Sequence, residues 1–150
     1  MRRIDIAVVV VGAIALASAP MAVYGQCVMF DKPEDLFANS DAVFVGTVVR
    51  NAPTGAQGDH VIVDVATLRL DRSWKGVRDR EVRVGSDVPL EVEKKYLVFA
   101  AGKPLSTSVL CRWAEPVDDA KAKVKLEWLS RKPSRPAGQP PGGGHDEGQR

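Results

Sequence analysis

The stretch Ser40–Val49, "SDAVFVGTVV", decides the fold of this chain. It is rich in β-branched residues, and both of its alternating faces are apolar around residues 43–45. This pattern predicts a β-strand that is buried on both sides. Gly46, in the middle of the run, indicates a bulge or a sharp bend, which small closed barrels need at their corners.

Four more stretches have the composition of strands and are separated by turn residues. They are expected at about 60–71, at 81–85, at 95–101 and in the run that ends at Cys111. A short helix is expected at about 33–39, because Pro33 and the two acidic residues after it suit a first helical turn.

A second helix is expected between Pro116 and Arg131, where apolar residues recur at three- and four-residue steps. We expect this amphipathic helix to pack across the sheet through Val117, Val124 and Trp128. The elements together predict a mainly β fold, a five-stranded OB-type Greek-key barrel with a short N-terminal helix and a C-terminal amphipathic helix. A closed barrel removes the exposed edges of short strands, although a small sandwich fits the same pattern.

Three segments are expected along the chain. Residues 1–25 have a basic start, a long uncharged apolar run and small residues at the end, which is typical of a signal peptide cleaved before Gln26. An uncleaved membrane anchor is the alternative, because the run is just long enough to span a bilayer. Residues 26–131 would form the barrel domain. Residues 132–150 are rich in Pro and Gly, and we expect them to be a disordered tail.

Charge and cysteine content narrow the function further. Removing Arg2, Arg3 and Asp5 with the leader leaves 19 basic and 18 acidic side chains, a balance that argues against nucleic-acid binding. We also expect no membrane association after cleavage, and a secreted or periplasmic location. In such an oxidising compartment the two cysteines, Cys27 and Cys111, are expected to form a disulfide, with free thiols as the alternative.

Four segments, in their order and spacing, resemble the bacterial domains that are similar to tissue inhibitors of metalloproteinases. These segments are "PEDLFANSDAVFVGTVV", "SWKG", "KYLVFAAG" and "LSTSVLC". The resemblance covers about Cys27 to Leu129, and it implies the OB-type barrel of the netrin-module group. No single motif among them is diagnostic.

The chain departs from the pattern of that family in its cysteines. Family members typically begin with C-x-C and carry another cysteine in the loop before the "YLVFA" strand. Here Gly25 stands in the place of the first cysteine, and the loop "GSDVPLEVEKK" contains none. The family pattern therefore implies that both ends of one bridge are missing and that the other bridge, Cys27–Cys111, is kept.

No pattern in the sequence indicates catalysis, a cofactor or a metal site. The two histidines, His60 and His145, belong to no catalytic or metal-binding motif, and the glycines of "PPGGGHD" follow no strand. Asp64 is expected to be an ordinary outward-facing carboxylate of its strand. The three tryptophans, Trp74, Trp113 and Trp128, are expected to be apolar anchors of the fold.

We therefore expect an exported, non-enzymatic protein-interaction module whose partner is an unidentified protein, with an extracellular protease as one candidate. Its partner-contacting segment would be Gln26, Cys27, Val28 and Met29. The alternative is a metalloproteinase inhibitor that acts through the same segment. In the eukaryotic relatives the first mature cysteine chelates the zinc of the target, and this chain would begin at Gln26 instead. An enzyme whose site leaves no motif is the third hypothesis.

Overall fold

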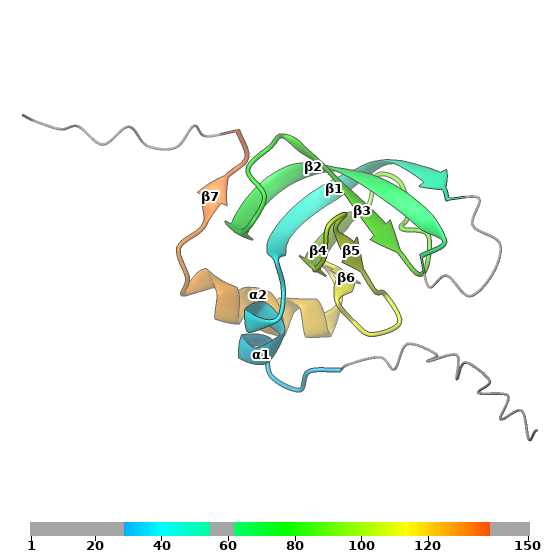
Figure 1. Cartoon of the computed structure of the whole chain (residues 1–150). Helices are drawn as coiled ribbons and strands as arrows, with labels where there is room; N and C mark the ends of the chain where they lie inside the picture. Colours follow the sequence, from blue (N-terminus) through cyan, green and yellow to red (C-terminus); the bar gives the residue numbers. More distant parts are fainter. Residues whose placement is uncertain (1–28, 55–61, 139–150) are drawn as a thin grey trace, which may run out of the picture.

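The computed structural model describes residues 29–54 and 62–138 of the 150-residue chain. The expected signal peptide, residues 26–28 and most of the expected tail lie outside these ranges. The described residues form a mainly β structure, a nearly closed barrel accompanied by two helices (Figure 1). The predicted fold class is thereby confirmed. Neither helix is long and apolar enough to cross a membrane within the described ranges.

The elements follow one another along the chain in the order α1, five strands, a short sixth strand, α2 and a final short strand. Their bounds are α1 Pro33–Ala38, β1 Ala42–Pro53, β2 Asp64–Lys75, β3 Glu81–Ser86, β4 Lys95–Ala100, β5 Ser106–Thr107, β6 Ala114–Pro116, α2 Ala120–Ser130 and β7 Arg135–Pro136.

The strands form one seven-stranded sheet in which β1 lies between β2 and β4. Both neighbours run antiparallel to β1, β2 along nearly its whole length and β4 along its first half, Ala42–Thr47. β3 continues the sheet beyond β2, and β5 joins β3 in parallel. A bridge between Ala101 and Ser106 links β5 back to the end of β4. The sheet therefore curls round on itself, which leaves few unpaired edges.

The bend predicted at Gly46 is present in β1. The pairing with β2 shifts its register between Val45 and Gly46, and again on either side of that point. A Cβ added at Gly46 would lie 3.0 Å from the carbonyl oxygen of Arg69. Glycine is therefore required here because the two backbones approach closely where the strand bends.

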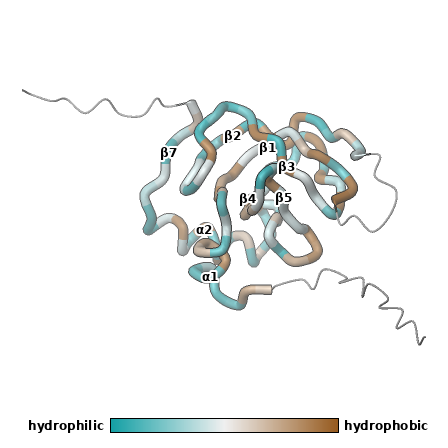
Figure 2. The backbone as a smooth tube through the Cα atoms, viewed as in Figure 1, coloured by the Kyte–Doolittle hydropathy of each residue, from teal (hydrophilic) through white to brown (hydrophobic). Residues whose placement is uncertain are grey.

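Both faces of β1 are buried, as its sequence predicts. One face, with Phe44 and Val48, fills the interior of the barrel together with Leu68 and Val98 from the neighbouring strands. The opposite face, with Val43 and Val45, contributes to a second apolar cluster outside the barrel. The other strands differ: β3 alternates at its start between exposed and buried residues, whereas β4 is buried from Tyr96 to Ala100, and Figure 2 shows hydrophobic and hydrophilic stretches along the backbone.

The two helices cover the outer face of β1 and β4. Figure 1 shows them next to each other on one side of the barrel, and the rings of Phe37 in α1 and Trp128 in α2 have centroids 5.6 Å apart. Leu36, Ala122 and Leu129 are buried in the second cluster. Without these helices, the outer apolar residues of the sheet would face water.

Two parts of the prediction for the second helix are wrong: the buried position of Val124 and the residue at which the helix begins. Val124 is 64% exposed, whereas Ala122, Leu126 and Leu129 turn toward the sheet. The predicted apolar face assumes that the helix begins at Pro116. Residues 114–116 instead form β6, which pairs with β4. The helix begins at Ala120, after the side chain of Asp119 accepts a hydrogen bond from the backbone N–H of Lys121 at 2.8 Å. Val117, which precedes the helix, and Trp128 are partly buried there, as expected.

Two further expectations are corrected at the end of the domain. The predicted fifth strand is only Ser106–Thr107, so Cys111 lies in a turn and not in a strand. The expected tail is ordered at its beginning, since Arg135 and Pro136 pair with Ser73 and Arg72 of β2. This pairing supplies partners along an edge of β2 that β3 does not reach.

Substituting residues on opposite faces of α2 tests this packing. Leu129→Ala should lower the free energy of unfolding by about 3 kcal/mol, because it opens a cavity in the second cluster. Val124→Ala removes an exposed side chain and should change it by less than about 0.5 kcal/mol. Urea unfolding of both variants measures the difference. Equal losses in the two variants would contradict the assigned buried face.

Candidate interaction surface

The turn that contains Cys111 is held in place by hydrogen bonds within it and from other elements. It runs from Ser108 to Trp113, between β5 and β6, and the N–H of Trp113 donates to the carbonyl of Ser108 at 2.8 Å. Arg112 occupies the left-handed backbone region, with φ at 60°. A non-glycine residue adopts this conformation only where the surrounding structure holds it.

Asp87 supplies much of that support from the loop after β3. One of its carboxylate oxygens accepts the backbone N–H of Val109 at 2.8 Å, and the other accepts the hydroxyl of Ser108. The same hydroxyl oxygen accepts the N–H of Cys111 at 2.9 Å. The carboxylate of Asp87 thus holds the amide of Val109 directly. It holds the amide of Cys111 indirectly, through the hydroxyl of Ser108.

The other side of the turn is tied to α2 by charge. Glu115 is buried in β6 and forms an ion pair of 2.9 Å with Lys125. The ammonium of Lys125 also donates to the carbonyl of Arg112 at 2.6 Å and lies 5.7 Å from the ring centroid of Phe99. A carboxylate and a carbonyl thus compensate this cation for its loss of water. These contacts connect the turn to the helix through a single side chain.

The entry segment of the domain lies against this turn. The rings of Phe30 and Trp113 have centroids 5.9 Å apart, and both residues border the second apolar cluster. Met29, which precedes Phe30, is 60% exposed, and Leu110, in the turn, is 71% exposed. Large side chains of this kind are costly in water when they occur together. We refer to Met29, Phe30, Leu110 and the turn Ser108–Trp113 as the entry surface.

The sequence predicted only part of the entry surface. Met29 is the one member of the proposed contact segment that is described, and Gln26, Cys27 and Val28 lie outside the described residues. No free cysteine occurs in residues 29–54 and 62–138, but the pairing of Cys111 with Cys27 stays a prediction. Leu110 was missed because it was assigned to a strand, although its position beside Cys111 was visible in the sequence.

The expected roles of the tryptophans agree with their surroundings. Each of them packs against the second apolar cluster. The indole N–H of Trp74 donates to the carbonyl of Leu129 at 3.0 Å, so this residue joins β2 to α2. Asp64, however, is buried and does not face outward, and its side chain accepts the N–H of Val65 at 2.9 Å.

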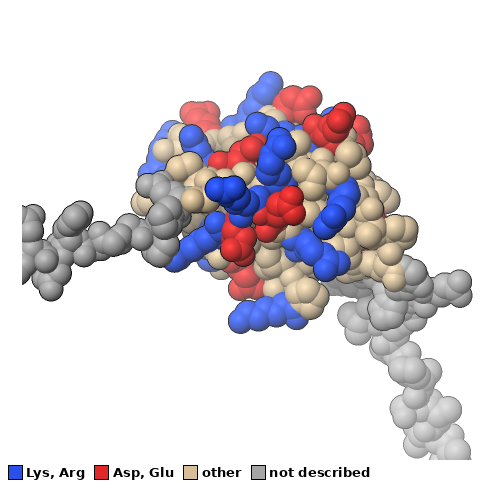
Figure 3. Space-filling model, turned by 90° about the horizontal axis from the view of Figure 1, so that it is seen from above, with Lys and Arg blue, Asp and Glu red and all other residues tan. Residues whose placement is uncertain are grey.

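Electrostatic features of the surface are mixed. On the face seen in Figure 3, basic and acidic side chains are interspersed and no large area of one sign stands out. Phosphate backbones are recognised by continuous basic areas, which this face does not offer. Within the described part of the chain, no three side chains of His, Cys, Asp or Glu gather as a metal-binding group.

Comparison with known proteins adds no assignment to these observations. No protein-family model matches the chain, and no curated protein matches it. The similarity to the netrin-module group therefore depends on the quoted sequence segments and their spacing alone.

Removing the carboxylate of Asp87 should loosen the turn selectively. Asp87→Ala leaves the amide of Val109 without its partner, and we expect a loss of about 1–2 kcal/mol in the free energy of unfolding. The amides of Val109 and Cys111 should exchange faster with solvent than those of β1. Asp79→Ala, at an exposed aspartate outside the turn, is the control. Unchanged exchange at both turn amides would contradict the role given to Asp87.

The predicted disulfide can be tested in oxidised protein. Peptide mapping without reductant should recover residues 27 and 111 in one cross-linked fragment. The bridge would close a loop of about 80 residues, so Cys111→Ser should lower the free energy of unfolding by at most about 4–5 kcal/mol. Reduced wild-type protein should unfold like the variant. Two thiols that can be alkylated in folded, oxidised protein would contradict the bridge.

Proposed function

We propose that this protein is an exported protein-interaction module and that the entry surface contacts its partner. The observation that carries the proposal is the exposure of Leu110 on a turn fixed by Asp87. A side chain that protrudes from a rigid support loses little backbone freedom when it is buried by a partner. Met29 is a second exposed apolar side chain, on the entry segment that Phe30 anchors to Trp113 of the turn.

The surroundings of Leu110 suit an interface. Apolar side chains that become the centre of an interface are commonly ringed by polar groups that exclude water after binding. Arg112 and Asp87 supply such groups beside the turn. Val124 is a comparably exposed apolar residue, but it belongs to α2 and is not part of the turn.

Metalloproteinase inhibition remains the second candidate, and the resemblance supports it. The zinc-chelating residue of the eukaryotic relatives is a first cysteine, however, whereas this chain would begin at Gln26 and carry Cys27 behind it. The amine of an N-terminal glutamine is lost when it cyclises. A general interaction module therefore fits the chain better than a strong inhibitor of zinc proteases.

Site-specific cross-linking tests the main proposal. A photoreactive residue placed at position 110 should give a discrete covalent complex in the native cell envelope, and the same residue at position 124 should not. Both positions are exposed, so a difference reports on location and not on accessibility. Leu110→Asp should weaken capture of the cross-linked partner at least about tenfold, as expected for a central interface residue. Equal labelling at both positions would contradict the proposal.

A panel of zinc proteases separates the two candidates. Correctly processed protein should show no inhibition at nanomolar concentrations, because no N-terminal cysteine is available to reach the zinc. Nanomolar inhibition that disappears when residues 26–29 are deleted, and that persists in Leu110→Asp, would instead establish the inhibitor.

A further inference from the structure

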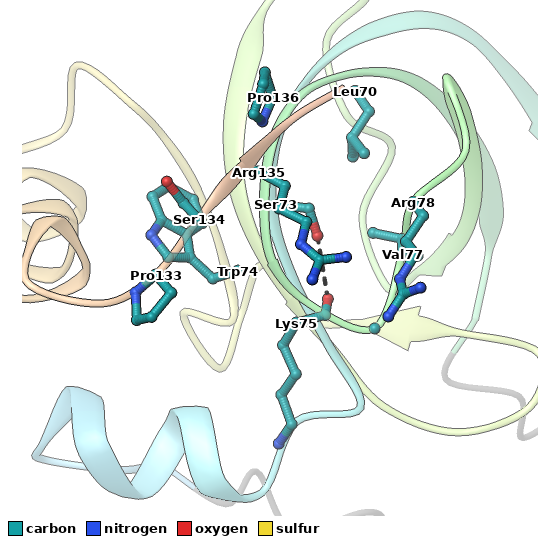
Figure 4. A pocket seen from close by; sticks show the side chains of 11 residues that line it. Leu70, Ser73, Trp74, Lys75, Val77, Arg78, Pro133, Ser134, Arg135 and Pro136 are labelled. Atoms are coloured by element: carbon teal, nitrogen blue, oxygen red, sulfur yellow. Dashed lines mark hydrogen bonds between the residues drawn. The ribbon is translucent and has the colours of Figure 1, made fainter. Parts of the chain in front are cut away.

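A pocket of about 290 Å³ lies at the end of β2, away from the turn that holds Cys111. Its floor is formed by the last residues of β2, including Ser73 and Trp74. One wall is the turn at 76–78, and the other is the returning segment Pro133–Pro136, which pairs with β2 through β7 (Figure 4). The pocket therefore exists only because the start of the expected tail folds back onto the barrel.

The turn at 76–78 has a fixed shape. Gly76 adopts φ of 80°, and a Cβ at this position would come within 2.2 Å of the carbonyl oxygen of Asp41. Only glycine fits this close approach to the chain that enters β1. The "SWKG" segment thus has a structural reason for its glycine, and the wall that it forms is pre-organised.

Arginine side chains give the pocket its charge. Arg78 and Arg135 both line it, and no acidic residue does. Neither guanidinium forms an ion pair within residues 29–54 and 62–138, since the ion pairs of that region involve other cations. In Figure 4, Arg135 extends from β7 toward the hydrogen bond between Ser73 and Lys75, and Arg78 lies on the far side of the pocket.

Lys75 does not add its charge to this group. Its ammonium donates to the carbonyl of Phe37 at 2.9 Å and to that of Ala38, at the end of α1. Figure 4 shows the side chain directed away from the pocket toward that helix. The lysine therefore stabilises α1, and the cationic groups available to a ligand are the two guanidinium groups.

We propose that this pocket binds a phosphate group, either free or as a monoester. Two guanidinium groups on opposite walls offer more N–H donors than the two oxygens of a carboxylate can accept. Ser134 also lines the pocket and can add a hydroxyl donor, whereas the hydroxyl of Ser73 already donates to the carbonyl of Lys75. A phosphate carries three or four oxygens with more than one negative charge, and arginine pairs with such groups in a bidentate manner. The proposal does not depend on the interaction surface beside Cys111.

The dimensions of the pocket limit the ligand to a small group. Its volume of about 290 Å³ lies at the lower end of the range for small-molecule sites. Trp74 and Pro133 give it apolar sides, and the indole N–H of Trp74 is already engaged by Leu129. The aromatic ring can therefore contact the carbon next to a phosphate but donates no hydrogen bond to it.

Nuclear magnetic resonance provides a readout with internal references. Titration with inorganic phosphate should shift the indole N–H signal of Trp74 and the amide of Ser73 in a saturable manner. The indole signals of Trp113 and Trp128 should not move, because these residues do not line the pocket. Added sodium chloride should weaken the effect, since the contacts are ionic.

Two double variants distinguish the effect of the pocket arginines from the effect of removing positive charge elsewhere on the surface. Arg78→Gln combined with Arg135→Gln should weaken phosphate binding at least about tenfold. Arg69→Gln combined with Arg83→Gln removes the same amount of charge from exposed positions of β2 and β3. This double variant should change the affinity for phosphate less than twofold. Equal weakening in both pairs, or no saturable shift in the wild type, would overturn the proposal. Thermal unfolding of all variants confirms that each is folded.

Two further ligands show whether the phosphate group belongs to a soluble monoester or to a lipid headgroup. Glycerol 3-phosphate should bind at least as tightly as inorganic phosphate if the ligand is a soluble monoester. Vesicles that contain phosphatidic acid should compete with it only if the pocket accepts a lipid headgroup. Binding of either source with loss in the Arg78/Arg135 variant supports the proposal, and binding of neither overturns it.

Discussion

The burial of both faces of β1 is the constraint on which the rest of the structure depends. A strand whose two faces are apolar cannot lie at the surface of a one-layer sheet. The inner face, with Phe44, is buried because the sheet closes into a barrel, and the outer face, with Val43, needs a separate cover. The chain supplies that cover from both of its ends, with α1 before β1 and α2 after β6. The two helices are therefore part of the core and not additions to it.

Long side chains make this cover continuous. Trp74 reaches from β2 to the last turn of α2, and the ammonium of Lys132 lies 4.4 Å from the ring centroid of Trp128. Lys75 and Lys132 both lie 5.2 Å from the ring centroid of Phe37 in α1. Cations above aromatic faces contribute modestly at exposed sites, but here they also shield apolar surface with their methylene chains. The same arrangement turns the chain after α2 back toward β2, so the helix cover also determines where β7 lies.

The sequence could predict the features that depend on local periodicity and could not predict those that depend on distant partners. Alternation and β-branching located β1, β3 and β4 and the first part of β2, which continues to Lys75 beyond the predicted end at 71, and Gly46 marked the bend. The start of α2 was missed because residues 114–116 have partners only in β4, which the local pattern does not reveal. β7 was missed for the same reason, since a short segment with a proline and little apolar surface pairs only because an edge of β2 is left open.

The candidate sites also contain some features that the sequence predicts and others that depend on distant parts of the chain. The neighbourhood of Cys111 was predictable, because a cysteine at the end of the domain and an entry segment at its start suggested a common region. The carboxylate of Asp87 that fixes the turn was not predictable, since it comes from a loop more than 20 residues earlier in the chain. The pocket with Arg78 and Arg135 was also invisible, because its two arginines are brought together by β7 alone.

The turn at Cys111 is held by hydrogen bonds that do not involve a disulfide. Asp87 and Ser108 fix its amides, and Lys125 connects its carbonyl group at Arg112 to α2. A bridge to Cys27 would act together with these hydrogen bonds and would tie the entry segment to the turn. There, Phe30 is anchored by Trp113 while Met29 protrudes. The turn would then provide the rigid half of a binding surface, and the bridge would reduce the freedom of the other half before a partner arrives.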